Sequence, residues 1–118
     1  MKTKKTIYIA HPIGGDIQGN IKKVLEICKA IHTDTTIPVV PYIVSLQYLD
    51  DENPKARDLG IEADFEAMRR GYVDEVWLYG DRITGGMKGE IDLALSLCIP
   101  VIPKTEETER EFEKLFKK

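Results

Sequence analysis

The sequence predicts a single α/β domain built on a small parallel sheet of about four strands. Short apolar runs alternate along the chain with segments whose apolar residues recur at every third or fourth position. This alternation favours a parallel sheet with right-handed crossovers and helices on both faces. The 118 residues suit one domain spanning 1–118. We therefore expect a three-layer fold of the Rossmann or flavodoxin type, with strand order 2-1-3-4.

The first half of the chain holds two of the expected strands. Residues 6–10 are β-branched, aromatic and apolar, and the run stops at a Pro- and Gly-rich segment. An amphipathic helix follows, with Asp16 as its expected N-cap. Two prolines in the run 37–41 indicate an edge strand. We expect residues 42–57 to form a long loop, interrupted by one short helical turn at 45–49.

The second half supplies the other two strands. The run 73–79 is almost continuously apolar, which is typical of a strand buried on both faces, so we place it centrally. The other expected elements are a helix over 58–71, a glycine-rich connection over 80–86, a helix over 87–98, a strand over 99–103 and a final helix over 106–117. Ligands of such sheets bind outside the carboxyl ends of the strands. Those ends carry the loops 11–16, 42–57 and 80–87.

Composition and charge exclude several functions. The chain has 17 Lys and Arg against 20 Asp and Glu and no extended basic cluster, so we expect no nucleic-acid polymer as partner. Apolar runs are shorter than a membrane span or signal peptide, which predicts a cytoplasmic protein with no membrane partner. Cys28 and Cys98 stand among apolar residues without a CxxC pattern, so we expect reduced core cysteines, no metal and no cofactor.

Two carboxylates occupy positions that the helical period assigns to the interior. Steps of 100° place Glu90 on the side of its helix that carries Met87 and Ala94, and Asp64 at the flank of the stripe formed by Ile61 and Met68. Burying a charge without a purpose is costly. An inward-facing carboxylate is therefore a candidate for catalysis.

Each of these acids also has a simpler interpretation. Glu90, expected in the first turn of its helix, is also explained as a capping-box or helix-dipole acid, and the same position would keep it ionised as a nucleophile requires. Asp64 is also explained as an ion-pair partner of Arg57 or Arg69, or as a solvated flank residue. A pair of inward acids suits glycosidic cleavage, in which one carboxylate meets the anomeric carbon and another acid protonates the leaving group.

The expected substrate-binding residues lie in the loops at the carboxyl edge. Free backbone N–H groups before the Glu90 helix suit an anion such as phosphate, although a flexible turn explains the same residues. His11 is either a ligand contact or a loop histidine, and Tyr8 is either a core residue or a ligand contact. The full set is His11, Gly14, Gly15, Thr84, Gly85, Gly86 and Met87.

Several of these segments together resemble the nucleoside 2-deoxyribosyltransferase superfamily, and most closely its short DUF4406 branch. The resemblance rests on residues 7–10 with Gly14-Gly15, on Asp64, on 84–94 and on 99–101. It implies a nucleophilic role for Glu90, base protonation by Asp64 and orientation of the nucleophile by Tyr8. It also implies a phosphate contact at Thr84 and a homodimer or higher homo-oligomer. His11, where the hydrolases have Ser, and the longer interval from Met87 to Glu90 depart from the superfamily pattern.

The sequence therefore predicts an enzyme that cleaves or exchanges the N-glycosidic bond of a nucleoside, a deoxynucleoside or its 5'-monophosphate. Its partner is a small molecule and its catalytic residues are Glu90, Asp64 and Tyr8. The alternative, favoured by the two departures from the pattern, is a non-catalytic protein that senses a nucleotide or an ADP-ribose-type ligand. Hydrolysis and transfer, and the identity of the base, stay open at this point.

Overall fold

The sheet has four parallel strands in the order β2-β1-β3-β4, as the sequence predicts. A computed structural model of the protein describes residues 3–116. The strands are β1 (Lys5–Ala10), β2 (Thr36–Val39), β3 (Glu75–Leu78) and β4 (Val101–Pro103). Tyr8 pairs with Val39 on one side and Val76 on the other, which puts β1 and β3 in the interior of the sheet. The Pro-containing β2 lies at an edge, where an unpaired backbone position is tolerated.

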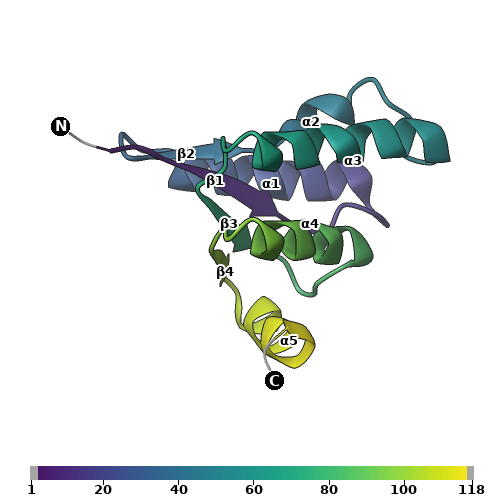
Figure 1. Ribbon diagram of the computed structural model, residues 1–118. Helices are drawn as coiled ribbons and strands as arrows, with labels where there is room; N and C mark the ends of the chain where they lie inside the picture. Colours follow the sequence, from purple (N-terminus) through teal and green to yellow (C-terminus); the bar gives the residue numbers. More distant parts are fainter. Residues whose placement is uncertain (1–2, 117–118) are drawn as a thin grey trace.

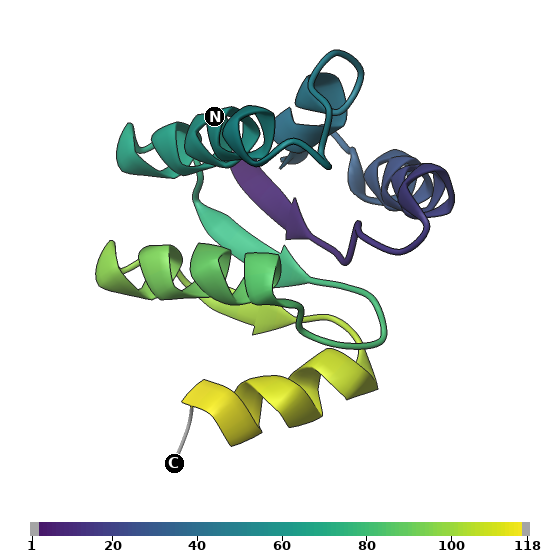
Figure 2. The ribbon, with the colours of Figure 1, turned by 90° about the vertical axis from the view of Figure 1, so that its right-hand side faces the viewer.

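The helices form a layer on each side of this sheet, which gives the Rossmann/flavodoxin-like arrangement. Helix α1 (Ile17–Ile31) covers one face, whereas α3 (Pro54–Arg69) and α4 (Gly85–Ser96) lie side by side on the other (Figures 1 and 2). The short α2 (Pro41–Ser45) packs against α3, and α5 (Glu106–Phe116) packs beside β4. The final helix was expected to reach Lys117, which lies outside the described residues.

Strand β1 is the centre of the hydrophobic core. Ile7, Tyr8, Ile9 and Ala10 are all fully buried. Alternate residues of a strand point to opposite faces, and Tyr8 bonds to Glu90 of α4. Tyr8 and Ala10 therefore face α3 and α4, whereas Ile7 and Ile9 face α1.

Two helices begin earlier than the sequence pattern indicates, and in both a proline stands at the first position. Half of the segment 42–57 is helical instead of forming one long loop, because α2 covers 42–45 and α3 covers 54–57. Helix α2 starts at Pro41, so the helical turn expected at 45–49 lies several residues too late. Helix α3 starts at Pro54 instead of residue 58, with Asn53 as N-cap accepting hydrogen bonds from the backbone of Lys55 and Ala56. Proline at the first position loses no intrahelical hydrogen bond, which is why it can open both helices.

Helix α4 also begins two residues before its expected start. Its N-cap is Thr84, whose hydroxyl accepts a hydrogen bond from the Met87 backbone N–H at 3.2 Å. Gly85 and Gly86 are its first helical residues, which intrinsic propensity disfavours. Glu90 consequently lies in the second turn, and its expected place in the first turn is wrong.

The remaining expectations concern cysteines, membranes and metals. Both cysteines are free, but Cys98 is exposed, so its expected core position is wrong. In the described part of the chain no helix is long and apolar enough to span a membrane. Among residues 3–116 no three His, Cys, Asp or Glu side chains are grouped so that they could hold a metal ion.

Candidate active site

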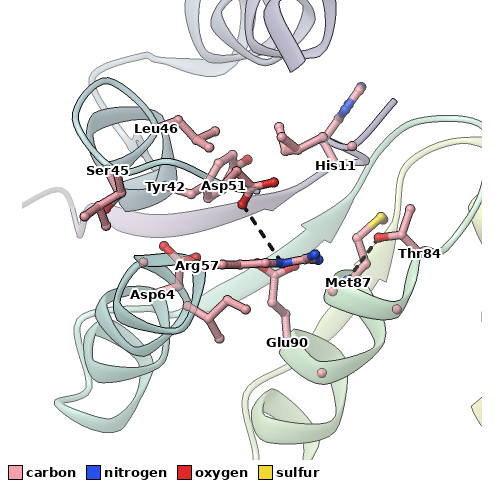
Figure 3. Close-up of a pocket in the computed structure, with 18 of the residues that line it drawn as sticks. His11, Tyr42, Ser45, Leu46, Asp51, Arg57, Asp64, Thr84, Met87 and Glu90 are labelled. Atoms are coloured by element: carbon pink, nitrogen blue, oxygen red, sulfur yellow. Dashed lines mark hydrogen bonds and ion pairs between the residues drawn. The ribbon is translucent and has the colours of Figure 1, made fainter. Parts of the chain in front are cut away.

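A cavity of about 520 Å³ opens at the carboxyl edge of the sheet, where sheets of this type bind ligands. Its volume falls in the range of small-molecule sites. The walls come from the loop after β1, from α2 and the start of α3, and from the segment that joins β3 to α4 (Figure 3). The residues that line the cavity include His11, Gly14, Tyr42, Ser45, Leu46, Leu49, Asp51, Arg57, Gly60, Ile61, Asp64, Phe65, Arg82, Thr84, Gly85, Gly86, Met87 and Glu90.

Glu90 is held at the base of this cavity by a tyrosine from the sheet. The Tyr8 hydroxyl donates a hydrogen bond to its Oε2, and Glu90 as a residue is partly buried and lines the cavity. Burial raises the pKa of Glu90 to about 8; the Tyr8 hydrogen bond lowers it and the nearby Asp64 raises it further. The expectation that the helix terminus keeps Glu90 ionised is therefore wrong, because loss of hydration outweighs any benefit from a helix end that lies more than a turn away.

The capping interpretation of Glu90 is also excluded. In a capping box the reciprocal acid stands three residues after the N-cap. That position in α4 is Met87, because Thr84 is the N-cap. Glu90 faces the cavity and bonds to Tyr8 instead.

Asp64 reaches the same cavity from α3. Only 6% of its surface is exposed, and its Oδ1 has no hydrogen-bond partner within the described residues. Burial raises the pKa of Asp64 to about 7, against the lowering effect of the Tyr8 hydroxyl and the Tyr42 backbone N–H. A buried acceptor without a partner is costly unless a proton or a ligand supplies the missing donor.

Neither arginine proposed as a partner of Asp64 contacts it. Arg57 lies 4.0 Å from Asp51 across the cavity mouth, as the dashed line in Figure 3 marks. Arg69 pairs with Glu62 and Glu66 at 3.1 and 3.3 Å. The ion-pair interpretation of Asp64 is therefore wrong, and so is that of a solvated flank residue.

Asp64 and Glu90 together behave as a coupled acid pair. Their pKa values of about 7 and about 8 mean that the pair carries roughly one proton between these pH values. Like charges in a shared low-dielectric site resist simultaneous ionisation. Near neutral pH the site thus contains one carboxylic acid and one carboxylate.

Two buried tyrosines support this pair. Tyr8 and Tyr42 have ring centroids 5.9 Å apart, and the Tyr42 hydroxyl donates to the Ile9 carbonyl oxygen. Burial, together with the charge of Glu90, raises the pKa of both phenols well above its usual value. Both therefore stay protonated as hydrogen-bond donors. Tyr8 is therefore a core residue whose hydroxyl also donates a hydrogen bond to Glu90.

The loop after β1 contributes less than expected. His11 lines the cavity, but its Nδ1 donates to the Pro12 carbonyl oxygen at 2.6 Å, and in Figure 3 the ring points away from Asp64 and Glu90. Burial lowers the pKa of His11, which favours the neutral ring. Gly14 lines the cavity, whereas Gly15 lines only a neighbouring hollow.

The segment 84–87 lies where the sequence places it. Thr84, Gly85, Gly86 and Met87 all line the cavity, and Figure 3 shows Thr84 and Met87 at the end of the helix that carries Glu90. The Thr84 hydroxyl oxygen is occupied by its capping bond to Met87, so it has less capacity to contact a ligand than a free hydroxyl. A Cβ added at Gly85 would meet no atom within 4 Å, so the backbone there is open to a ligand.

Several lining residues were missed by the sequence reasoning, most of them on α2 and the first turns of α3. Arg57 lies seven residues before Asp64, which places both on one helical face. The seven-residue spacing indicates a shared face only if α3 already includes Arg57, and the sequence pattern had placed the start of this helix at residue 58. The missed residues that matter here are Tyr42, Ser45, Asp51, Arg57, Gly60 and Arg82.

Comparison with known proteins corrects the resemblance drawn from the sequence. No curated protein matches the chain. A family model described as a domain of unknown function, DUF7768, matches residues 5–104. This is a different family from the DUF4406 branch, and nothing in the match supports membership of the nucleoside 2-deoxyribosyltransferase superfamily, so no residue role passes to this chain from that superfamily. The motifs that suggested it are short and glycine-rich, and the parallel-sheet geometry by itself places such segments at the carboxyl edge. The chain belongs to DUF7768, a domain family of unknown function.

Proposed function

We propose that this protein cleaves or exchanges the N-glycosidic bond of a nucleoside, a deoxynucleoside or its 5'-monophosphate. One observation carries the proposal: Asp64 and Glu90 reach one cavity from adjacent helices, and their raised pKa values leave the pair with a single proton near neutral pH. Glycosidic cleavage needs one carboxylic acid and one carboxylate at the same bond. The proposal therefore rests on the geometry and protonation of this pair alone.

The roles within the pair follow from exposure and hydrogen bonding. Glu90 is partly buried, lines the cavity and is oriented by Tyr8, which suits a nucleophile. Its carboxylate oxygen forms a bond to the anomeric carbon while the bond from that carbon to the base nitrogen breaks. The electron pair of the broken bond stays on the base, which takes the proton from Asp64. Because the pKa of Glu90, about 8, lies above that of Asp64, about 7, the single proton resides mainly on Glu90 in the free protein, and the reaction proceeds from the less populated form with the proton on Asp64. Positive charge that develops on the sugar stabilises the carboxylate form of Glu90 during this step.

The second half of the reaction reverses these roles. Asp64, now a carboxylate, removes a proton from water or from the nitrogen of an incoming base. That acceptor bonds to the anomeric carbon and displaces the Glu90 carboxylate. Water gives hydrolysis and a base gives transfer.

The cavity walls divide in a way that suits such a substrate. Apolar side chains from α3 and from the segment between α2 and α3 form one side, with Leu46, Leu49, Ile61 and Phe65 available to pack against a base. Arg57 and Arg82 supply positive charge at the mouth, and the N-terminal backbone of α4 lies beside Glu90. Asp64, which protonates the leaving group, lies on the apolar side.

Base release from a panel of deoxynucleosides and their 5'-monophosphates, followed by chromatography, tests the proposal. We expect wild-type protein to liberate free base and Glu90→Gln to lose at least roughly a thousandfold of that activity, as removal of a covalent nucleophile does. Asp92→Asn is the matched control, because Asp92 is an exposed carboxylate on the same helix. Absence of base release from every substrate, or equal rates for Glu90→Gln and wild type, overturns the proposal. If a nucleotide raises the Tm of the protein but is not cleaved, the protein is a nucleotide-binding protein and not an enzyme.

The pH dependence of base release follows from the pair. Below about pH 7 both groups gain protons and no carboxylate is left to attack. Above about pH 8 both groups ionise and no acid is left to protonate the base. We expect a bell-shaped rate profile with its maximum between about pH 7 and 8. A rate that is constant from pH 5 to 9 would contradict the shared-proton mechanism.

A further inference from the structure

The segment 80–84, which joins β3 to α4, brings two side chains to the cavity. Arg82 and Thr84 line the cavity, whereas Ile83 between them packs against the hydrophobic core. Arg82 is exposed and pairs with Asp81 at 2.8 Å. Exposed connections are mobile unless contacts with the rest of the protein hold them. The contacts of this segment therefore decide where Arg82 and the start of α4 meet a ligand.

The first residue of the segment is held from two sides. Gly80 has a φ of +99°, and a Cβ added there would come within 2.5 Å of Pro12 Cδ. Glycine alone combines this backbone conformation with so close an approach of the loop after β1. The Gly80 carbonyl oxygen also accepts a hydrogen bond from the Thr105 hydroxyl at 2.8 Å. The segment is thus fixed where it leaves β3.

The far end of the segment is held by an acidic side chain of α5. Glu111 Oε1 accepts a hydrogen bond from the Ile83 backbone N–H at 3.0 Å, and Glu111 is half-buried. Helix α5 has other contacts that attach it to the protein. Phe112 is buried in the core, and the buried Thr108 hydroxyl donates to the Leu78 carbonyl oxygen at 3.3 Å. Removal of the Glu111 carboxylate should therefore release Ile83 and leave α5 in place.

The acid pair is anchored in a different way. Glu90 is held by the Tyr8 hydroxyl and by the buried residues Met87, Ile91 and Ala94 of its own helix. Asp64 comes from α3. Neither anchor uses the hydrogen bond between Glu111 and Ile83. A change at Glu111 should consequently affect the binding of a substrate more than the chemical step.

We propose that Glu111 is a positioning residue for substrate binding, whose hydrogen bond to Ile83 holds Arg82 and the first turn of α4 where they meet the substrate. This inference rests on the proposed function, because it takes the cavity as the substrate site. A segment that is already ordered does not have to be ordered when the substrate binds, so less binding free energy is lost. Without the hydrogen bond, KM rises while kcat, which depends on Asp64 and Glu90, is retained.

Steady-state base release from deoxyadenosine and deoxycytidine 5'-monophosphates tests the inference. Glu111→Ala removes the acceptor, whereas Glu111→Gln keeps an amide oxygen that accepts the same hydrogen bond. We expect Glu111→Ala to raise KM roughly tenfold and to change kcat less than about threefold. Glu111→Gln should keep KM within about threefold of wild type. Glu113→Ala is the matched control with wild-type KM, because Glu113 is an exposed acid of α5 outside the cavity.

Amide hydrogen exchange gives a readout that does not depend on turnover. The Ile83 amide of Glu111→Ala should exchange about tenfold faster than in wild type, with the amides of Ile91 and Ala94 unchanged. A Tm within about 2 °C of wild type shows that the fold is kept. An unchanged KM in Glu111→Ala, a fall in kcat as large as the rise in KM, or equal damage from Glu111→Gln and Glu111→Ala overturns the inference.

The two proposals fail in different ways. If wild-type protein releases no base, isothermal titration with the same two monophosphates takes the place of KM. Weaker binding by Glu111→Ala than by wild type then removes the enzymatic function and leaves the positioning role, whereas no binding to wild type overturns that role as well. If base is released with the same KM in wild type and Glu111→Ala, the enzymatic function stands and the positioning role fails.

Discussion

The two faces of strand β1 are equally buried but have opposite chemistry. On the α1 side Ile7 and Ile9 pack against apolar residues such as Val24, and all three are fully buried. On the α3 and α4 side Tyr8 is equally buried, but its neighbours include the carboxyl groups of Glu90 and Asp64. The first face lowers the free energy of the fold through hydrophobic burial. The second places ionisable groups where water is scarce, which raises both carboxyl pKa values.

This difference assigns stability to one face and chemistry to the other. Sites that hold carboxyl groups with raised pKa values are less stable than an apolar core of the same volume, and that cost is typical of active sites. Variants on the α1 face should therefore change stability, whereas variants on the α3 and α4 face should change activity and pH response. The predictions below test this division, beginning with the largest expected effect.

Ile9→Ala should lower the free energy of unfolding by about 2–5 kcal/mol, the usual effect of removing most of a buried isoleucine side chain from a core. Chemical denaturation with urea measures this change. Any activity that survives should show the wild-type pH profile, since Ile9 points away from the acid pair. A loss below about 1 kcal/mol would mean that the α1 face is not the main source of stability.

Tyr8→Phe should lower the rate of base release by about 10–100-fold while the ring keeps its packing. The Tyr8 hydrogen bond lowers the pKa of Glu90, so its removal raises that pKa. The Tyr8 hydroxyl also lowers the pKa of Asp64, so both limbs of the rate profile should move to higher pH in Tyr8→Phe. Tyr42→Phe is the matched control, because the Tyr42 hydroxyl bonds to the Ile9 carbonyl oxygen and not to a carboxyl group. An identical shift in both variants would contradict a specific role for Tyr8.

The stability of the wild-type protein should fall as pH rises from about 4 to about 8. The native state keeps the protons of Asp64 and Glu90 up to about pH 7 and 8, whereas the unfolded chain releases them near the ordinary pKa values of 3.8 and 4.5. The native state thus binds more protons in this interval, and linkage makes the slope of unfolding free energy against pH negative. The contribution of the pair is full below about pH 4 and lost above about pH 8.

Glu90→Gln and Asp64→Asn should each remove part of that slope. At pH 8.5 each should stabilise the protein by on the order of 1–2 kcal/mol relative to wild type, because a neutral amide avoids the ionisation penalty. Thermal melts at pH 5 and pH 8.5 measure the effect. If wild type gains stability over this interval, or if the variants lose stability at pH 8.5, the acid pair is not destabilised by burial.

Arg57→Gln should have the smallest effect on the fold, since Arg57 is an exposed residue with a long ion-pair contact to Asp51. We expect an unchanged Tm and a loss of up to roughly tenfold in affinity for deoxynucleoside 5'-monophosphates, with little change for the free nucleosides. Arg110→Gln is the control, because Arg110 is exposed on α5 outside the cavity. Equal affinity of Arg57→Gln and wild type for the monophosphates would remove Arg57 from the site.

The fold was predictable because its signals are local and repeated. Alternating apolar strands and amphipathic helices predict the parallel sheet, and the prolines of the run 37–41 correctly predict an edge strand, although only Pro38 lies in β2. The helix starts were not predictable to the same degree. Pro41 and Pro54 were interpreted as strand and loop residues, but each is the first residue of a helix. For this reason the sequence did not predict α2, or Tyr42 and Ser45 as residues that line the cavity.

The site was predictable only in part, because it depends on long-range environment. Periodicity identifies Glu90 and Asp64 as inward-facing, and the structure places both at one cavity. Their protonation could not be obtained from helix position, since burial by the sheet and by the facing helix decides it.

The central claim is that Asp64 and Glu90 share a proton near neutral pH, and carboxyl carbon NMR tests it directly. Titration of protein labelled with ¹³C at Asp and Glu, with assignments from Asp64→Asn and Glu90→Gln, follows each group. We expect two apparent pKa values between about 7 and 8, far above those of the exposed carboxyl groups. If both groups titrate near 4 like exposed carboxylates, the pair holds no proton at neutral pH and the proposed mechanism fails.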